Sequence, residues 1–77
     1  MMHEVKKKIL LFIYDNEGER GVTTEEVSKG TKMEWNNASK WCYSLASQGF
    51  VSKSGKPVRF KTFAKTKRYI LHKEWRK

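Results

Sequence analysis

The 77-residue sequence predicts a single α+β domain, with three helices followed by a C-terminal β-hairpin. Apolar residues recur at helical spacing over residues 3–16. A helix-capping pattern starts at Thr23, and an amphipathic segment over residues 34–48 ends at Gly49. β-prone residues follow Gly49 inside a strongly basic stretch. A chain this short has room for one small hydrophobic core.

The first helix is expected over about residues 3–16. Its main apolar stripe falls at positions that share one helix face, and consists of Val5, Ile9, Phe12 and Ile13. Three further apolar residues lie outside this stripe: Leu10, Leu11 and Tyr14. Either the C-terminal tail, residues 72–77 with Trp75, or a second copy of the chain is expected to cover them. We expect a homodimer through this helix and the tail.

Local capping signals delimit the second and third helices. Thr23 followed by Glu26 is a capping box, in which each side chain bonds the backbone amide of the other residue. The second helix is therefore expected over about residues 24–29, and Gly30 is expected to end it. The third helix is expected over about residues 34–48, with Gly49 as its stop.

The third helix has an apolar inner face and a polar outer face when its residues are projected at about 100° per position. The inner face carries Ala38, Trp41, Cys42 and Leu45. Trp35 lies on the border of this inner face. The outer face carries Asn36, Lys40, Tyr43 and Ser47, and it is flanked by Asn37, Ser39 and Ser44. Cys42 is the single cysteine, and we interpret it as a small buried hydrophobe and not as a nucleophile.

The positive charge is confined to the last third of the chain. The formal net charge is +9, from 17 Lys and Arg against 8 Asp and Glu. Residues 1–49 contain seven basic and seven acidic residues, whereas residues 50–77 contain ten basic residues and only Glu74. This segregation indicates an anionic partner for one end of the molecule.

The basic stretch is interpreted as a hairpin over about residues 50–71. Phe50 and Val51 begin the first strand, and "RYIL" at 68–71 is expected to form the second. The tip lies either at Gly55–Pro57 or later, at Ala64–Thr66. Phe60 and Phe63 alternate with the cations, and covering the small core is favoured for them over stacking on bases.

Enzymatic chemistry and membrane insertion are not expected. The chain has no Cys or His cluster with metal-ligand spacing and no glycine-rich phosphate loop, and the acids of the first half fall at apparent surface positions. No cofactor or metal is therefore expected. No apolar run approaches the roughly 18 to 20 residues of a membrane span. A signal peptide is not expected, because "ILLFIY" at 9–14 is too short and too early for the apolar region of one. We expect a cytoplasmic, nucleoid-associated protein.

The predicted order of elements is helix, short strand at Val22, helix, turn, helix and hairpin. It resembles the winged helix-turn-helix family of DNA-binding domains, of the small prokaryotic or viral transcriptional regulator type. The resemblance is carried by "TTEEVSKGTKMEW", by "NNASKWCYSLASQGFV" and by "RYIL". In that family a leucine, a glycine and two apolar residues mark the step from the recognition helix into the wing, as do Leu45, Gly49, Phe50 and Val51 here.

The resemblance implies sequence-specific binding of double-stranded DNA by a transcriptional regulator with a three-helix helix-turn-helix core. The recognition helix would lie in the major groove, with Asn36, Asn37 and Lys40 reading bases. Phosphate contact or plain solvation remains the alternative for each of these three. The other expected recognition-helix contacts are Trp35, Ser39, Tyr43 and Ser44. The wing contacts, on the backbone or minor groove, would be Lys53, Lys56, Arg59, Lys61, Lys65 and Lys67.

Two other classes of function remain open. Winged helices also bind RNA or serve as protein-interaction modules, and the asymmetric charge argues against the second of these. Binding to a membrane surface is disfavoured, because the sequence lacks a helix with cations on one face and large apolar groups on the other.

Overall fold

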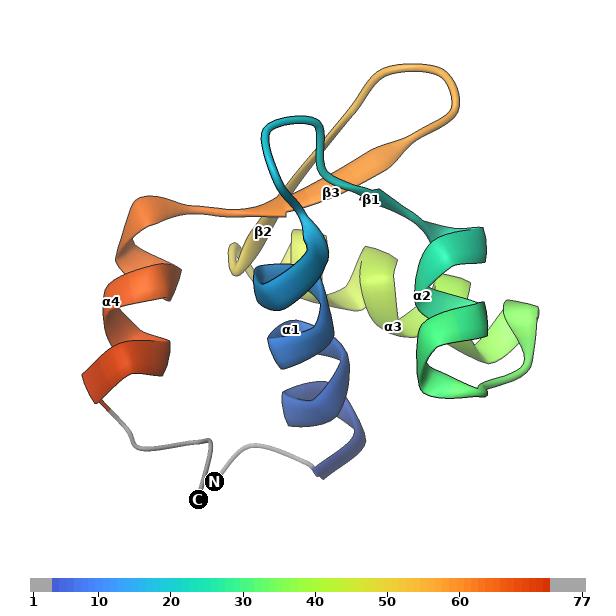
Figure 1. Cartoon of the computed structure of the whole chain (residues 1–77), viewed down its shortest axis with the longest axis horizontal. Coiled ribbons are helices and arrows are strands. Elements are labelled where there is room, and N and C mark those ends of the chain that lie inside the picture. The colour runs from blue at the N-terminus through green and yellow to red at the C-terminus, as the bar shows by residue number, and fades with distance from the viewer. Residues whose placement is uncertain (1–3, 73–77) are drawn as a thin grey trace.

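The computed structural model describes residues 4–72 and consists of four helices and a three-stranded antiparallel sheet, which confirms the predicted α+β class (Figure 1). The strand order is β1-β3-β2, so β3 pairs with both other strands. Along the chain the elements are α1 (Glu4–Asn16), β1 (Val22–Thr23), α2 (Thr24–Thr31), α3 (Trp35–Ser47), β2 (Val51–Ser54), β3 (Arg59–Thr62) and α4 (Ala64–His72).

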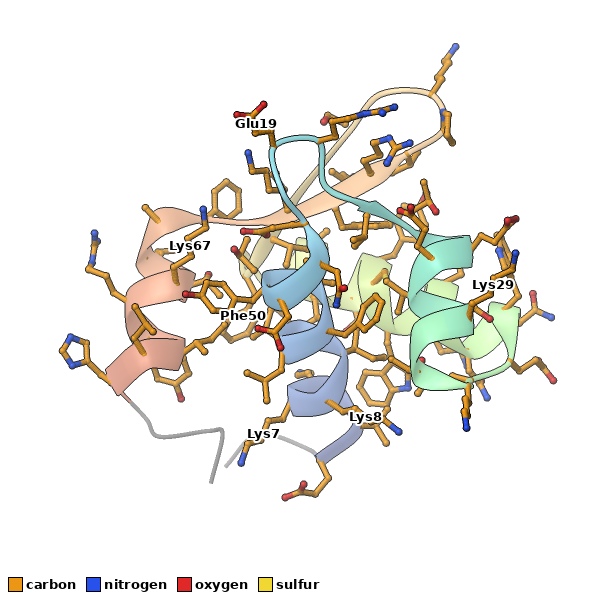
Figure 2. The ribbon with its side chains drawn as sticks, viewed as in Figure 1. Lys7, Lys8, Glu19, Lys29, Phe50 and Lys67 are labelled. Carbon is orange, nitrogen blue, oxygen red and sulfur yellow. The ribbon has the colours of Figure 1, made fainter. Side chains whose placement is uncertain are left out.

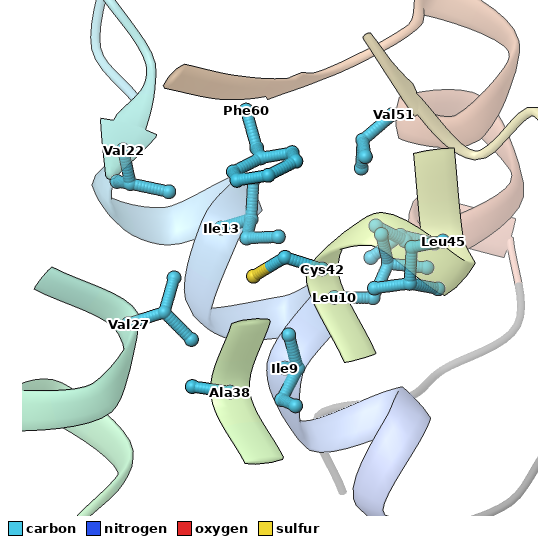
Figure 3. Close-up of a cluster of buried hydrophobic side chains, with 11 residues drawn as sticks. Ile9, Leu10, Ile13, Val22, Val27, Ala38, Cys42, Leu45, Val51 and Phe60 are labelled. Carbon is cyan, nitrogen blue, oxygen red and sulfur yellow. The ribbon is translucent and has the colours of Figure 1, made fainter. Parts of the chain in front are cut away.

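All helices and all three strands contribute to one core (Figure 3). The inner face predicted for α3 is confirmed at three positions, although Trp41 is only half-buried. Leu10, which lies outside the predicted stripe of α1, is fully buried because α1 packs against α2, α3 and β3. The buried apolar residues are Ile9, Leu10, Ile13, Val22, Val27, Ala38, Cys42, Leu45, Val51, Phe60 and Ile70.

The capping box at the start of α2 is confirmed, but the predicted end of this helix is wrong. The Glu26 amide donates to Thr23 Oγ1 at 3.1 Å, and the Thr23 amide donates to Glu26 Oε1 at 2.8 Å. The helix continues through Gly30 to Thr31, and Lys32 ends it in the left-handed conformation with φ 57°. Gly30 is instead a packing residue, because a methyl group there would overlap the Phe12 ring of α1.

Gly49 ends α3 as predicted. Its φ of 83° is left-handed, and the two bonds of a Schellman motif follow. The Phe50 amide donates to the Leu45 carbonyl at 3.0 Å, and the Gly49 amide donates to the Ala46 carbonyl at 3.1 Å. This reversal turns the chain directly from α3 into β2.

The hairpin is shorter than predicted, and its second strand lies at Arg59–Thr62 and not at residues 68–71. β3 spans Arg59–Thr62 and pairs with β2 from Val51↔Thr62 to Ser54↔Arg59, so the tip is residues 55–58, the earlier of the two alternatives. Residues 68–71 belong to α4. Residues 64–72 are rich in helix formers, and Thr66 and Ile70 of this segment are buried at a spacing of one helical turn.

Glu17 contradicts the expectation that the acids of the first half lie on the surface. It is 7% exposed. Its Oε1 accepts the Thr62 amide at 2.7 Å, and both of its oxygens accept from the Thr62 hydroxyl at 2.9 Å. Lys67 Nζ lies 3.4 Å from Glu17 Oε2. One carboxylate therefore joins the end of α1 to β3 and α4.

The homodimer stays a prediction, but part of its basis is removed. Leu10 is buried within the chain, while Leu11 and Tyr14 pack against the core. Trp75 lies outside the described residues.

Within residues 4–72, no helix combines the length and the apolar content that crossing a bilayer requires.

Candidate nucleic-acid interface

The outer face of α3 and the tip of the β2–β3 hairpin line one pocket. Its volume is about 480 Å³. α3 contributes every fourth residue of one helix face, and the N-cap and first turn of α2 complete the lining. The lining residues are Thr23, Thr24, Glu25, Trp35, Ser39, Tyr43, Pro57 and Val58.

Tyr43 of α3 packs against the hairpin. Its ring meets the ring of Phe60 edge to face, with centroids 5.3 Å apart and an interplanar angle of 89°. Lys53 Nζ lies 5.1 Å from the centroid of the Tyr43 ring, at cation–π distance. Phe60 is fully buried, as favoured from the sequence, whereas Phe63 is exposed. The tyrosine therefore joins the outer face of α3 to both hairpin strands.

Three predicted base-reading residues project from α3 without being used elsewhere in the described part of the chain. Asn36, Asn37 and Lys40 are exposed, and none makes a side-chain hydrogen bond or ion pair with residues 4–72. Their donors and acceptors are therefore available to a ligand.

The two predicted serines differ in their surroundings. Ser39 is half-buried in the pocket wall. Ser44 Oγ accepts a bond from Gln48 Nε2 at 3.2 Å, and Gln48 Oε1 accepts from Lys6 Nζ at 2.6 Å. Ser44 thus belongs to a polar chain that leads toward α1, and Ser39 belongs to the pocket.

The structure separates the predicted wing cations into three groups. Lys53 and Lys56 are exposed on the hairpin, and Lys53 contacts Tyr43 of α3. Arg59 and Lys61 lie on β3, where they contact the segment before β1. Lys65 and Lys67 are not in the hairpin but on α4.

Arg59 and Lys61 are occupied by intramolecular contacts. Arg59 Nη1 donates to the Gly21 carbonyl at 3.2 Å and lies 3.7 Å from Glu26 Oε1. Lys61 Nζ donates to the Glu19 carbonyl at 3.0 Å. These two cations brace the loop before β1, and binding a phosphate would require them to exchange or share these partners.

Acidic residues border the N-terminal end of the surface. Glu25 lines the pocket and lies 3.5 Å from Lys29, an exposed pair that contributes little. Glu34 is the exposed residue that precedes α3. A polyanion is therefore attracted more strongly to Lys40 and to the hairpin than to the first turn of α2.

Pro57 and Val58 line the pocket, although they were not among the predicted site residues. Their only local signal is the "SGKPV" turn next to the exit of α3, and the pairing of β2 with β3 is what carries this turn to the helix.

Cys42 is fully buried in the core. Burial raises the pKa of the Cys42 thiol from 9.0 to about 12, which keeps it protonated at neutral pH. Residues 4–72 contain no group of His, Cys, Asp and Glu side chains that could hold a metal ion.

No protein-family model matches the sequence, and no curated protein or solved structure is found to be similar to it.

Proposed function

We propose that the chain is a winged helix-turn-helix protein that binds double-stranded DNA through the outer face of α3 and the tip of the β2–β3 hairpin. The observation that carries the proposal is the convergence of these two elements on Tyr43, which packs on Phe60 beneath Lys53. The element order and the β1-β3-β2 sheet support the same assignment, because they place a hairpin directly beside the third helix.

The residues of α3 suit the chemistry of the major groove. A helix fits this groove, where an asparagine can pair with adenine through two bonds and a lysine favours guanine. Asn36, Asn37 and Lys40 have no competing partner among residues 4–72. Ser39 and Tyr43 lie on the same helix and line the pocket, and hydroxyls of this kind bind phosphate or sugar oxygens.

The hairpin supplies contacts that do not depend on sequence. Lys53 and Lys56 are exposed on the hairpin, so neutralising phosphates there releases condensed counterions. In this proposal Arg59 and Lys61 support the hairpin instead of gripping the ligand. A protein with these two kinds of contact would act as a transcriptional regulator.

A second candidate, binding of RNA, is favoured by one specific observation. Trp35 is 52% exposed and Tyr43 is 40% exposed, and both line the pocket. Exposed aromatic rings bind unpaired bases by stacking, which is the usual means of recognising single-stranded RNA.

Selection of binding sites from a random duplex library, with single-stranded RNA as competitor, separates these candidates. A recovered duplex motif that survives the competitor supports the proposal. If the single-stranded RNA competitor abolishes all duplex binding, the ligand is RNA and the proposal is wrong.

Variants then assign the two kinds of contact. Asn36→Ala and Asn37→Ala should each cost about 1 to 3 kcal/mol on the selected site and much less on random duplex. Lys53→Ala and Lys56→Ala should weaken binding to all duplexes alike. Each should also reduce the magnitude of the negative slope of log K against log salt by about 0.9. Lys29→Ala on α2 is the matched control. Equal losses on every duplex for the asparagine variants would make α3 a phosphate-binding surface and end the claim of sequence specificity.

A further inference from the structure

Helix α4 has a basic face that lies outside the surface formed by α3 and the hairpin tip. Its inward side is fixed by Ile70 in the core and by Thr66, whose hydroxyl donates to the Phe50 carbonyl at 2.7 Å. At about 100° per residue, Lys65 and Arg68 fall on the opposite side, and both are exposed.

The cations of α4 are engaged to different degrees. Lys67 is on the side that faces α1, where it pairs with Glu17 (Figure 2). Lys65 and Arg68 form no ion pair or hydrogen bond with any residue in the range 4–72. α4 contains no acidic residue. The sequence that follows is again mostly basic, although it lies outside the described residues: Lys73, Glu74, Arg76 and Lys77.

We propose that the outer face of α4 is a second contact surface for the phosphate backbone of duplex DNA, with Lys65 and Arg68 binding phosphates. α4 lies at the opposite end of the molecule from α2 (Figure 1). Neither Lys65 nor Arg68 lines the pocket between α3 and the hairpin. The charged side chains of α4 are all basic. The partner that suits such a helix best is a duplex backbone, whose phosphates repeat a negative charge whatever the base sequence. The inference shares duplex DNA with the proposed function but does not use the same surface.

The distribution of apolar groups on α4 argues against a membrane as the partner. A helix that lies on a bilayer has a continuous apolar face with cations on the other side. On α4 the exposed apolar residues are Leu71, which is 64% exposed, and Tyr69, which is 40% exposed. They lie on opposite flanks, with Arg68 and Lys65 between them, so a bilayer could not take up both without burying the charges.

Salt-dependent binding of the full chain to a random-sequence duplex tests this surface. Log K falls as log salt rises, and Lys65→Ala/Arg68→Ala should reduce the magnitude of this negative slope by about 1.8, or about 0.9 for each phosphate that is no longer neutralised. Lys65→Arg/Arg68→Lys should keep the slope. The control Lys8→Ala/Lys29→Ala removes the same charge from α1 and α2 and should leave the slope nearly unchanged. Melting curves verify that each variant folds.

The outcomes distinguish this inference from the proposed function. A slope for Lys65→Ala/Arg68→Ala equal to that of the control would overturn the inference, whatever Lys53→Ala/Lys56→Ala does. If the hairpin variant has no effect while the α4 variant does, the proposed function fails and the inference stands. If the α4 variant loses binding to phosphatidylserine vesicles but not to duplex, the choice of DNA as the partner of this face is wrong.

Discussion

At the scale of single residues, Glu17 shows what periodicity and composition miss. The sequence places it after the first helix in a polar turn, where a carboxylate is ordinarily solvated. Its partners Thr62 and Lys67 lie 45 and 50 positions further along the chain. Only the pairing of β3 and the docking of α4 bring them together, so no local pattern could reveal this burial.

Replacing Glu17 by alanine should destabilise the fold, because the buried Thr62 amide would lose its acceptor. We expect the free energy of unfolding to fall by about 1 to 3 kcal/mol, the usual cost of an unsatisfied buried donor. Glu19→Ala, at an exposed turn position (Figure 2), should change it by less than about 0.5 kcal/mol. Denaturant unfolding measures both. Equal effects of the two substitutions would show that the Glu17 contacts do not stabilise the protein.

Cys42 gives a pH-dependent prediction. Its pKa is raised from 9.0 to about 12 because the folded chain buries the thiol. The unfolded chain releases this proton near 9.0, so the stabilising contribution is complete below that pH and is lost between about pH 9 and 12.

Unfolding at pH 8 and at about pH 10.5 should therefore show a larger loss of stability for the parent chain than for Cys42→Ala. At pH 8 the native thiol should react with iodoacetamide only as fast as the protein opens, since the thiolate is the nucleophile. Rapid alkylation of the folded chain would contradict the burial of Cys42.

At the scale of elements, signals that are local in the sequence predicted the structure well, and intrinsic strand propensity predicted it poorly. The capping box at Thr23 and the stop at Gly49 are satisfied by neighbouring residues, and both are confirmed. The strand expected at residues 68–71 failed because strand propensity reflects packing and pairing. β3 already lies between β1 and β2, and Ile70 reaches the core from a helix.

The packing of α1 against α2 depends on the absence of a side chain at Gly30. Gly30→Ala should destabilise the protein by about 1 to 3 kcal/mol, because the added methyl group displaces the Phe12 ring. In a Phe12→Ala background the same change should stabilise it by up to about 1 kcal/mol through helix propensity. A double-mutant cycle of thermal or denaturant unfolding measures both values. The same sign in both backgrounds would show that the two helices do not meet at Gly30.

At the scale of the whole molecule, the segregated charge correctly separates the chain into a neutral first part and a basic last part, but it does not locate the proposed binding surfaces. The excess predicted for one long wing is divided among the hairpin, the braced strand β3 and helix α4. The outer face of α3 was predictable from helical projection alone. Its neighbours Pro57 and Val58 were not, since they depend on the register of β2 with β3.

We propose that duplex DNA binds where α3 meets the hairpin tip. Nuclear magnetic resonance titration of the ¹⁵N-labelled chain with the selected duplex tests this interface. We predict that the side-chain amides of Asn36 and Asn37 and the backbone amides of Tyr43 and residues 53–56 show the largest shift changes, with Lys29 on α2 unaffected. Saturable binding that leaves these signals in place, or no shift at any signal, would contradict the proposed interface.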